Sequence, residues 1–169
     1  MAKVAFLVDD IFEDSEFQVP YDEVRKAGHE AVVVGMEAGK VVSGKKGNKV
    51  TIEKGSRDVR AEELDAVVVP GGYSPDKVRT DPDLVALVRK TYEAGKPVAA
   101  ICHAGWVLAE ADIVRGKTVT SYHSIKTDLV NAGANWVDQE VVADGNLITS
   151  RKPDDLPAFC RTLLEQLGG

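Results

Sequence analysis

The chain has 169 residues and a formal net charge of −6 at pH 7; 44% of the residues are hydrophobic and 28% are charged. This length and ordinary composition predict a single domain over residues 1–169, with one core and no low-complexity linker. The acidic balance argues against a general affinity for nucleic acid or anionic lipid, which both attract basic surfaces, and favours a small or neutral substrate.

The first third of the chain predicts alternating strands and helices. Residues 4–8 form a continuous apolar run, which is typical of a strand buried on both faces of a parallel sheet. A helix pattern follows over residues 16–27, interrupted by Pro20 and ended by Gly28, and residues 31–35 predict the next strand. Parallel strands need a crossover that a helix supplies, so this opening indicates the α/β class.

The rest of the chain continues the alternation after an exposed insertion. Residues 39–58 predict one or two short strands, in a solvated hairpin with a turn at Gly47-Asn48. Residues 64–69 predict a core strand that stops at Pro70-Gly71-Gly72. Further strands are expected over residues 97–101, 118–121, 137–142 and 146–150, and further helices over residues 82–94, 103–109, 125–132 and 154–167. The predicted fold is a three-layer α/β sandwich with a mostly parallel central sheet.

Reactive groups in such sheets gather outside the carboxyl ends of the strands. Residues 9–13, 70–73, 102–103 and 121–123 all follow predicted strands. We therefore expect side chains from these segments to meet at one edge of the sheet.

Cys102 stands where an apolar strand runs into a helix start built from small residues, Ala104 and Gly105. A sharp turn there lifts the side chain out of the sheet and aims free helix N–H groups at the sulfur. Such surroundings lower a thiol pKa from ~8.5 to roughly 3.5–7.5, which makes thiolate available at neutral pH. We expect Cys102 to be a nucleophile; the alternative is a small hydrophobic core residue.

Two further groups are expected beside the sulfur. Glu13 follows the first strand, and its carboxyl can donate a hydrogen bond to a thiolate when protonated or accept one from the thiol when ionised. It can equally be a helix N-terminal acid, as can Asp14 and Glu16. Gly72 offers a backbone N–H suited to an oxyanion hole together with the amide of His103, although a bare turn is the alternative.

The partner of His103 is left open by the residues alone. Side chains of sequence neighbours seldom point at one another. We therefore expect the imidazole of His103 to be oriented by a side chain other than Cys102, or His103 to contribute only its backbone N–H. Asp76 can orient an imidazole, but its position favours a helix-start acid. Tyr122 and His123 are expected either to line the pocket or to pack against the rim of the sheet.

No metal and no cofactor are expected. Cys102, His103 and His123 are three potential ligands, but their spacing matches no common metal motif. The chain also carries no Gly-rich phosphate loop of the full Gly-x-x-x-x-Gly-Lys-Ser/Thr type.

The two cysteines, Cys102 and Cys160, lie far apart in the sequence, and we expect no structural disulfide and a reducing compartment. The N-terminus passes directly into a short strand without a secretory signal, and no apolar run reaches the ~18 residues of a membrane span. Cytoplasmic localisation without membrane association is the expectation.

Taken together, several motifs resemble the PfpI family of intracellular cysteine peptidases and deglycases. This family lies within the superfamily that includes the parkinsonism-associated deglycase and the class I glutamine amidotransferases. The resemblance spans nearly the whole chain and implies a flavodoxin-like, class I glutamine amidotransferase-like fold. Its motifs are Phe12-Glu13-Asp14, Val69-Pro70-Gly71-Gly72, Ala99-Ala100-Ile101-Cys102-His103, Ser121-Tyr122, Ile125-Lys126, Asn131-Ala132-Gly133-Ala134, Trp136-Val137-Asp138 and Thr149-Ser150-Arg151.

The resemblance implies roles for the candidate residues. Cys102 is the nucleophile, His103 its catalytic partner and Glu13 the acid beside the sulfur, while Gly72 and His103 supply oxyanion-hole amides and Tyr122 lines the pocket. An acid from a neighbouring subunit completes the triad in the peptidase members, and the matching position is Asp76. The implied assembly is a homodimer or hexamer with the active site near the interface.

Three positions depart from the family pattern. Asp76 stands where the peptidases carry glutamate, the run Ala104-Gly105-Trp106 replaces a Gly-Pro pair, and His123 replaces a proline. These departures bear on substrate choice.

The predicted function is a cysteine-dependent hydrolase with a role in the cellular stress response. By resemblance it acts on glycated protein groups, methylglyoxal or peptides. The alternative is a non-enzymatic redox-sensing or protective stress protein in which Cys102 is oxidised to sulfenic or sulfinic acid. A glutaminase is disfavoured because no separate downstream His-x-Glu pair is present.

Overall fold

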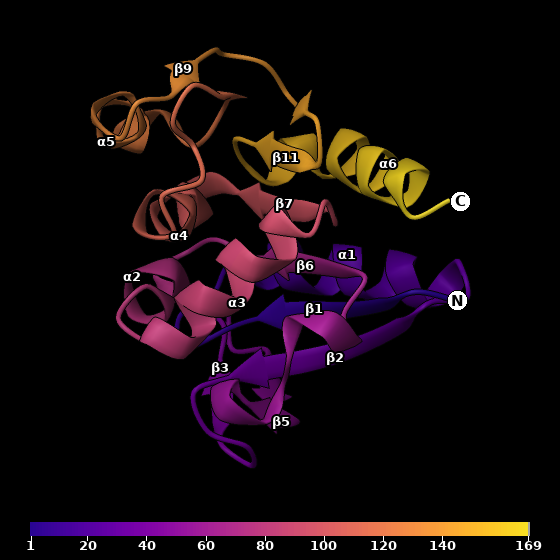
Figure 1. The fold of residues 1–169 in the computed structure, drawn as a ribbon. Helices are drawn as coiled ribbons and strands as arrows, with labels where there is room; N and C mark the ends of the chain where they lie inside the picture. Colours follow the sequence, from indigo (N-terminus) through magenta and orange to yellow (C-terminus); the bar gives the residue numbers. More distant parts are fainter. Residues whose placement is uncertain (169) are drawn as a thin grey trace.

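The computed structural model describes residues 1–168, which form a seven-stranded central sheet with helices on both faces (Figure 1). Only β10 runs antiparallel to its neighbour in this sheet, so the predicted mostly parallel arrangement is confirmed. In spatial order the strands are β10 (Val142–Asp144), β11 (Leu147–Ser150), β7 (Val98–Ile101), β6 (Ala66–Val69), β1 (Lys3–Leu7), β2 (Glu30–Gly35) and β5 (Lys54–Gly55).

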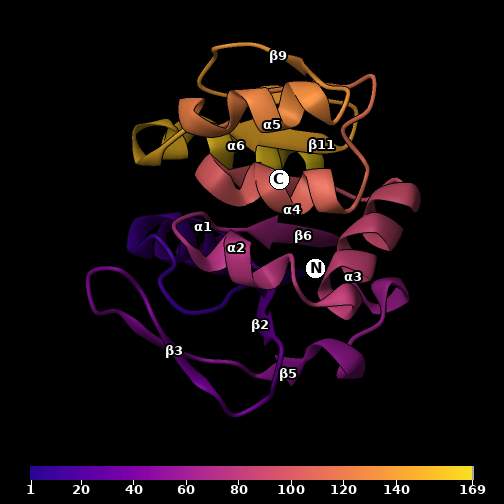
Figure 2. The same cartoon turned by 90° about the vertical axis from the view of Figure 1, so that its left-hand side faces the viewer.

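The helices form the two outer layers (Figure 2). One face of the sheet packs against α1 (Asp14–Lys26) and α6 (Leu156–Gln166), which also contact each other. The other face packs against α2 (Ser74–Val78), α3 (Pro82–Glu93), α4 (Gly105–Glu110) and α5 (Lys126–Asn131). This is the predicted three-layer α/β sandwich.

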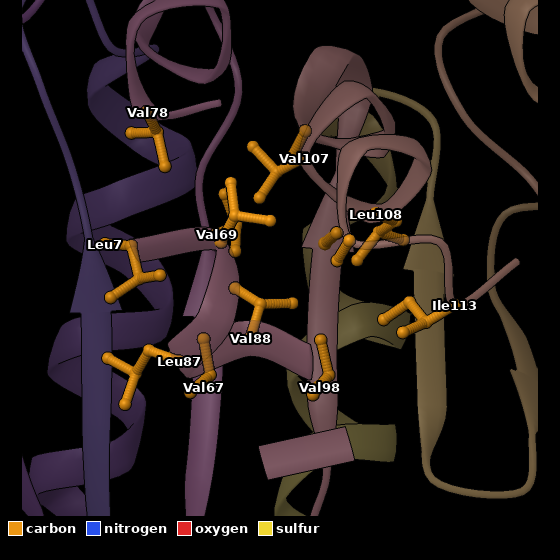
Figure 3. Packing of buried hydrophobic residues seen from close by; sticks show 14 of the residues in the cluster. Leu7, Val67, Val69, Val78, Leu87, Val88, Val98, Val107, Leu108 and Ile113 are labelled. Carbon is orange, nitrogen blue, oxygen red and sulfur yellow. The ribbon is translucent and has the colours of Figure 1, made fainter. Parts of the chain in front are cut away.

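The buried strands explain the continuous apolar runs in the sequence. Along β1 and just beyond it, Val4, Phe6 and Val8 pack toward α1 and α6, whereas Ala5 and Leu7 pack toward the opposite layer. Figure 3 shows Leu7 in that second cluster, with valines and leucines of β6, β7, α3 and α4 around it. Because both faces of the strand are buried, every position from Val4 to Val8 is apolar.

The exposed insertion is a hairpin, as predicted. β3 (Val41–Ser43) and β4 (Lys49–Thr51) pair antiparallel. The carboxylate of Asp14 at the start of α1 accepts the backbone N–H groups of Lys46 and Asn48, at 2.8 and 2.9 Å. The tip of the hairpin is therefore attached to the start of α1.

Three elements differ from the predictions. Helix α1 is not interrupted at Pro20. The proline costs the helix one N–H donor, but its ring is buried in the fold and the helix continues. The predicted strand over residues 137–142 is wrong, because only Val142 of this range belongs to a strand, β10. β8 (Thr118–Val119) lies outside the central sheet and pairs with β9 (Asn135–Trp136), because β11 occupies the place beside β7.

Among residues 1–168, no helix has both the length and the apolar character needed to cross a bilayer.

Candidate active site

A strained turn mounts Cys102 at the carboxyl end of β7. Ile101 is still extended, whereas Cys102 has a φ of 65° and begins a 3-10 turn that leads into α4. A residue other than glycine adopts this left-handed conformation at a cost of about 1–3 kcal/mol, and such strain is concentrated at functional sites. The predicted strand-to-helix elbow is thus present, and it leaves the largely buried sulfur at the floor of a cavity.

This cavity has a volume of about 320 Å³ and lies at the carboxyl edge of the sheet. The loops after β1, β6 and β7 and the tip of the β3–β4 hairpin all contribute to it. Its lining residues are Glu13, Glu16, Lys45, Gly72, Tyr73, Cys102, His103, Tyr122 and Pro153. The expectation that segments distant in sequence meet at this edge is confirmed, because residues 9–13, 70–73, 102–103 and 121–123 each contribute at least one lining side chain or amide.

Two backbone amides point at the sulfur, those of Gly72 and His103. Gly72 has a φ of 84°, and a Cβ there would lie only 2.6 Å from the backbone N of Glu13 and 2.6 Å from the backbone O of Ile11. Only glycine fits this conformation and this space. The two predicted amides therefore lie beside the sulfur, and their oxyanion-hole role remains a prediction.

The acid beside the sulfur is Glu16, and the assignment of Glu13 to that place is wrong. Glu16 is fully buried: its Oε1 accepts the N–H of Gly71 at 2.8 Å, and the carboxyl interacts with the thiol of Cys102. Its Oε2 is buried without a nitrogen or oxygen partner among the described residues. The carboxyl group thus has one oxygen free to donate a proton to the sulfur.

Glu13 lies instead at the rim of the cavity. Its carboxylate forms ion pairs with Lys45 at 3.3 Å and Lys46 at 3.7 Å, both from the hairpin tip. Glu13 caps the start of α1 and faces the hairpin, whereas Glu16 shares the buried face of the helix with Pro20 and Val24. Phe17, four residues after Glu13, is buried as well, so helical spacing alone does not distinguish the two acids.

The surroundings raise, rather than lower, the pKa of the thiol. Burial raises the pKa of Glu16 to about 8. Burial and, next, the negative charge of Glu16 raise the pKa of Cys102 to about 12, against the opposing effect of the amides of Gly72 and His103. The predicted low pKa is therefore wrong, because burial outweighs the helix-start amides. A neutral thiol stands beside a protonated carboxyl at neutral pH.

A base is nevertheless in place. The Nδ1 atom of His103 lies 3.1 Å from the Sγ atom of Cys102, so these sequence neighbours do contact each other, contrary to the expectation. Burial lowers the pKa of His103, and the charges of Lys45 and His123 add to this effect. A neutral imidazole can accept the thiol proton on Nδ1 as the sulfur attacks.

The ring of His103 is fixed from three sides. Tyr122 stacks on it with centroids 5.0 Å apart, and Trp106 meets it edge-on at 5.2 Å. The Nε2 atom lies 3.1 Å from the Oγ atom of Ser124. Sequence reasoning missed Ser124, and no local pattern marks it, because only the tertiary structure brings this turn to the elbow.

The two remaining candidates lie outside the cavity in this chain. His123 is exposed and packs on Tyr122 at 4.4 Å, so the expected pocket-lining position is wrong for His123 and confirmed for Tyr122. Asp76 is exposed on α2, in a separate cleft with Arg79 and Glu110. A contact of Asp76 with His103 of a neighbouring subunit stays a prediction.

Within residues 1–168, no group of three or more His, Cys, Asp or Glu side chains is arranged to hold a metal ion. Cys102 and Cys160 are both free thiols.

The raised pKa of Glu16 predicts a pH-dependent stability. Between pH 4.5 and 8 the folded chain keeps a proton on Glu16 that the unfolded chain releases, so stability falls as the pH rises through this range. Replacing Glu16 with Gln removes this contribution. The unfolding free energy of the wild type should fall relative to Glu16→Gln by up to about 1.4 kcal/mol per pH unit.

Urea unfolding of both proteins at several pH values between 5 and 8 measures this difference. Glu13→Gln controls for the loss of a carboxylate near the cavity. Parallel stability curves for the wild type and Glu16→Gln would show that Glu16 is already ionised in the folded chain.

The fold and the site define a class of protein: a flavodoxin-like, class I glutamine amidotransferase-like sandwich with a cysteine on a strained elbow at the carboxyl ends of its strands. Within this class, the sequence matches the DJ-1/PfpI family over residues 2–166, and the chain belongs to that family.

Individual relatives match over nearly their whole length. Protein/nucleic acid deglycase 2 of Escherichia coli (strain K12) is 51% identical over 168 residues, or 98% of each chain. Deglycase PfpI of Pyrococcus furiosus is 41% identical over 165 residues, which cover 98% of this chain and 99% of its own.

A solved structure from Anabaena variabilis shares the fold at a TM-score of 0.98 and 43% identity. It is a two-domain protein with a DJ-1/ThiJ/PfpI-like and a ferritin-like domain, and the match covers 99% of this chain but 48% of that one. The chain therefore spans about half the length of that protein.

Proposed function

We propose that this protein is a cysteine-dependent hydrolase of the PfpI type that removes or hydrolyses carbonyl adducts, with glycated protein groups and methylglyoxal as substrates and peptides as the second class. The observation that carries the proposal is the 3.1 Å contact between the Sγ atom of Cys102 and the Nδ1 atom of His103 at the floor of an open cavity. The deglycase names of two close relatives support the substrate class.

The first step uses the base rather than a preformed thiolate. As the sulfur attacks the carbonyl carbon, the thiol proton moves to Nδ1 of His103, a C–S bond forms and the carbonyl π electrons move to oxygen. The N–H groups of Gly72 and His103 stabilise the oxyanion, and the proton on Glu16 is available to the sulfur.

The later steps depend on the substrate. When the substrate is an amide, the proton on His103 passes to the leaving nitrogen and the C–N bond breaks, which leaves a thioester on Cys102. Water then hydrolyses this thioester. With a 2-oxoaldehyde, the hemithioacetal isomerises internally to a 2-hydroxyacyl thioester, so no external oxidant is needed. Water then releases the 2-hydroxy acid and returns the proton to the sulfur.

Three further statements belong to this proposal. Residues 1–169 act as a single PfpI-like domain; the chain forms a homo-oligomer, a dimer or hexamer; and it works in the cytoplasm in the response to stress. Two free, buried thiols suit a reducing compartment.

Trapping of the covalent intermediate tests the function. The protein is mixed with methylglyoxal, quenched in acid within seconds and digested, and peptides are analysed by mass spectrometry. We expect a 2-hydroxyacyl group on the peptide with Cys102 and none on the peptide with Cys160, together with release of lactate.

The redox-sensing alternative gives a different result. Selective oxidation of Cys102 by dilute peroxide, with neither a trapped acyl group nor any hydrolysed product, would replace the hydrolase by a sensor. The raised pKa of Cys102, due chiefly to burial, works against this alternative, because thiolate is the form that peroxide oxidises.

A further inference from the structure

Both ring nitrogens of His103 have partners within the same chain. Nδ1 lies 3.1 Å from Sγ of Cys102, and Nε2 lies 3.1 Å from Oγ of Ser124. Ser124 belongs to the 3-10 turn His123–Ile125, which directly precedes α5. The family resemblance assigns orientation of this histidine to an acid from a neighbouring subunit, at the position of Asp76. Within this chain, Ser124 already lies at the ring nitrogen that does not contact the sulfur.

The chemistry of the four groups sets the direction of the hydrogen bonds. In the proposed first step the thiol donates its proton to Nδ1 of His103, so Nδ1 carries a lone pair in the reactive state. The neutral imidazole then holds its proton on Nε2, and the hydroxyl oxygen of Ser124 accepts it. On the other side of the sulfur, the carboxyl of Glu16 faces the thiol from its buried position.

We propose that Ser124 is a positioning residue that holds His103 in the tautomer able to accept the thiol proton, so that the catalytic base is oriented within a single chain. After the proton reaches Nδ1, both ring nitrogens carry protons, and Oγ of Ser124 still accepts the one on Nε2. No group has to rotate during the transfer. This inference rests on the proposed function and adds a residue to its site.

A hydroxyl and a carboxylate have different electrostatic consequences. The charged or titratable groups that face His103 are Cys102, Tyr122, Lys45 and His123, and neither Lys45 nor His123 favours the imidazolium. Ser124 is neutral and does not offset them, whereas a carboxylate at the same position would favour the imidazolium. Ser124→Asp is therefore expected to raise the pKa of His103.

The test is a titration of ¹⁵N-histidine-labelled protein by NMR. The chain has only three histidines, so their signals can be assigned with single variants. In Ser124→Ala we expect a mixture of the two neutral tautomers, a lower pKa of His103 and a loss of about tenfold in kcat/KM, because a hydrogen bond to the charged ring is lost. Ser124→Thr retains a hydroxyl and should restore all three properties.

Thr127→Ala is the matched control, because it removes an exposed hydroxyl from the adjacent helix α5. Unchanged tautomers and an unchanged pKa in Ser124→Ala would overturn the proposal. So would a shift of the His103 titration in Asp76→Asn without one in Ser124→Ala, because the partner's acid would then orient the ring. The NMR measurement needs no substrate, so its outcome is independent of whether the proposed hydrolase activity is correct.

Discussion

Replacing Cys102 with alanine is expected to lower kcat by at least about a thousandfold on every substrate of the protein. The sulfur forms the bond that every later step depends on, and among the described residues that line the cavity there is no second cysteine and no serine or threonine. Release of lactate from methylglyoxal and of free amine from glycated peptides measures the loss.

Cys160→Ala is the matched control for this experiment. Cys160 is also a free and largely buried thiol, and burial raises its pKa to about 12 as well. It lies on α6, away from the cavity that holds Cys102. Full activity in Cys160→Ala with none in Cys102→Ala separates nucleophilic attack from general thiol reactivity. Turnover that survives in Cys102→Ala would refute the proposed mechanism.

Replacing Gly72 with alanine is expected to damage both stability and activity. The left-handed φ of 84° alone costs an alanine about 1–3 kcal/mol. In addition, the new Cβ would lie 2.6 Å from two backbone atoms of the loop after β1, at Ile11 and Glu13. Backbone atoms cannot rotate away as a side chain can, so the loop must shift and carry the amide of Gly72 away from the sulfur.

Gly39→Ala is the control that separates the cost of the left-handed φ from the steric clash of the new Cβ. Gly39 has a similar φ of 87°, but a Cβ there would meet nothing within 4 Å. Urea unfolding should therefore show a larger loss of stability for Gly72→Ala than for Gly39→Ala. Only Gly72→Ala should also lower kcat. Equal losses of stability in the two variants, with full activity retained, would mean that the amide of Gly72 does not need its observed position.

The elements that the sequence predicted correctly are those encoded by local patterns. The buried strands appear as continuous apolar runs, the hairpin as a turn at Gly47-Asn48, and the elbow as an apolar strand followed by Cys102 and small residues. These patterns were enough to infer the sandwich and the place of the cysteine in it.

The errors concern neighbours that local patterns do not specify. Glu13 and Glu16 look alike as helix-start acids, and only the packing of α1 against the sheet selects Glu16. The strand at residues 118–119 looks like a core strand, yet β11 takes the place beside β7. The pKa of Cys102 rises because of burial beside Glu16, which depends on contacts across the whole fold.

By itself, then, the sequence determined the fold class and the residue that carries the sulfur, because hydrophobic periodicity and small residues act over a few neighbouring positions. The tertiary structure decided which acid, which histidine nitrogen and which hydroxyl surround that sulfur. These groups come from α1, from the elbow and from the turn before α5. Their distances are set by how the layers pack, and this long-range information is not present in any short stretch of the chain.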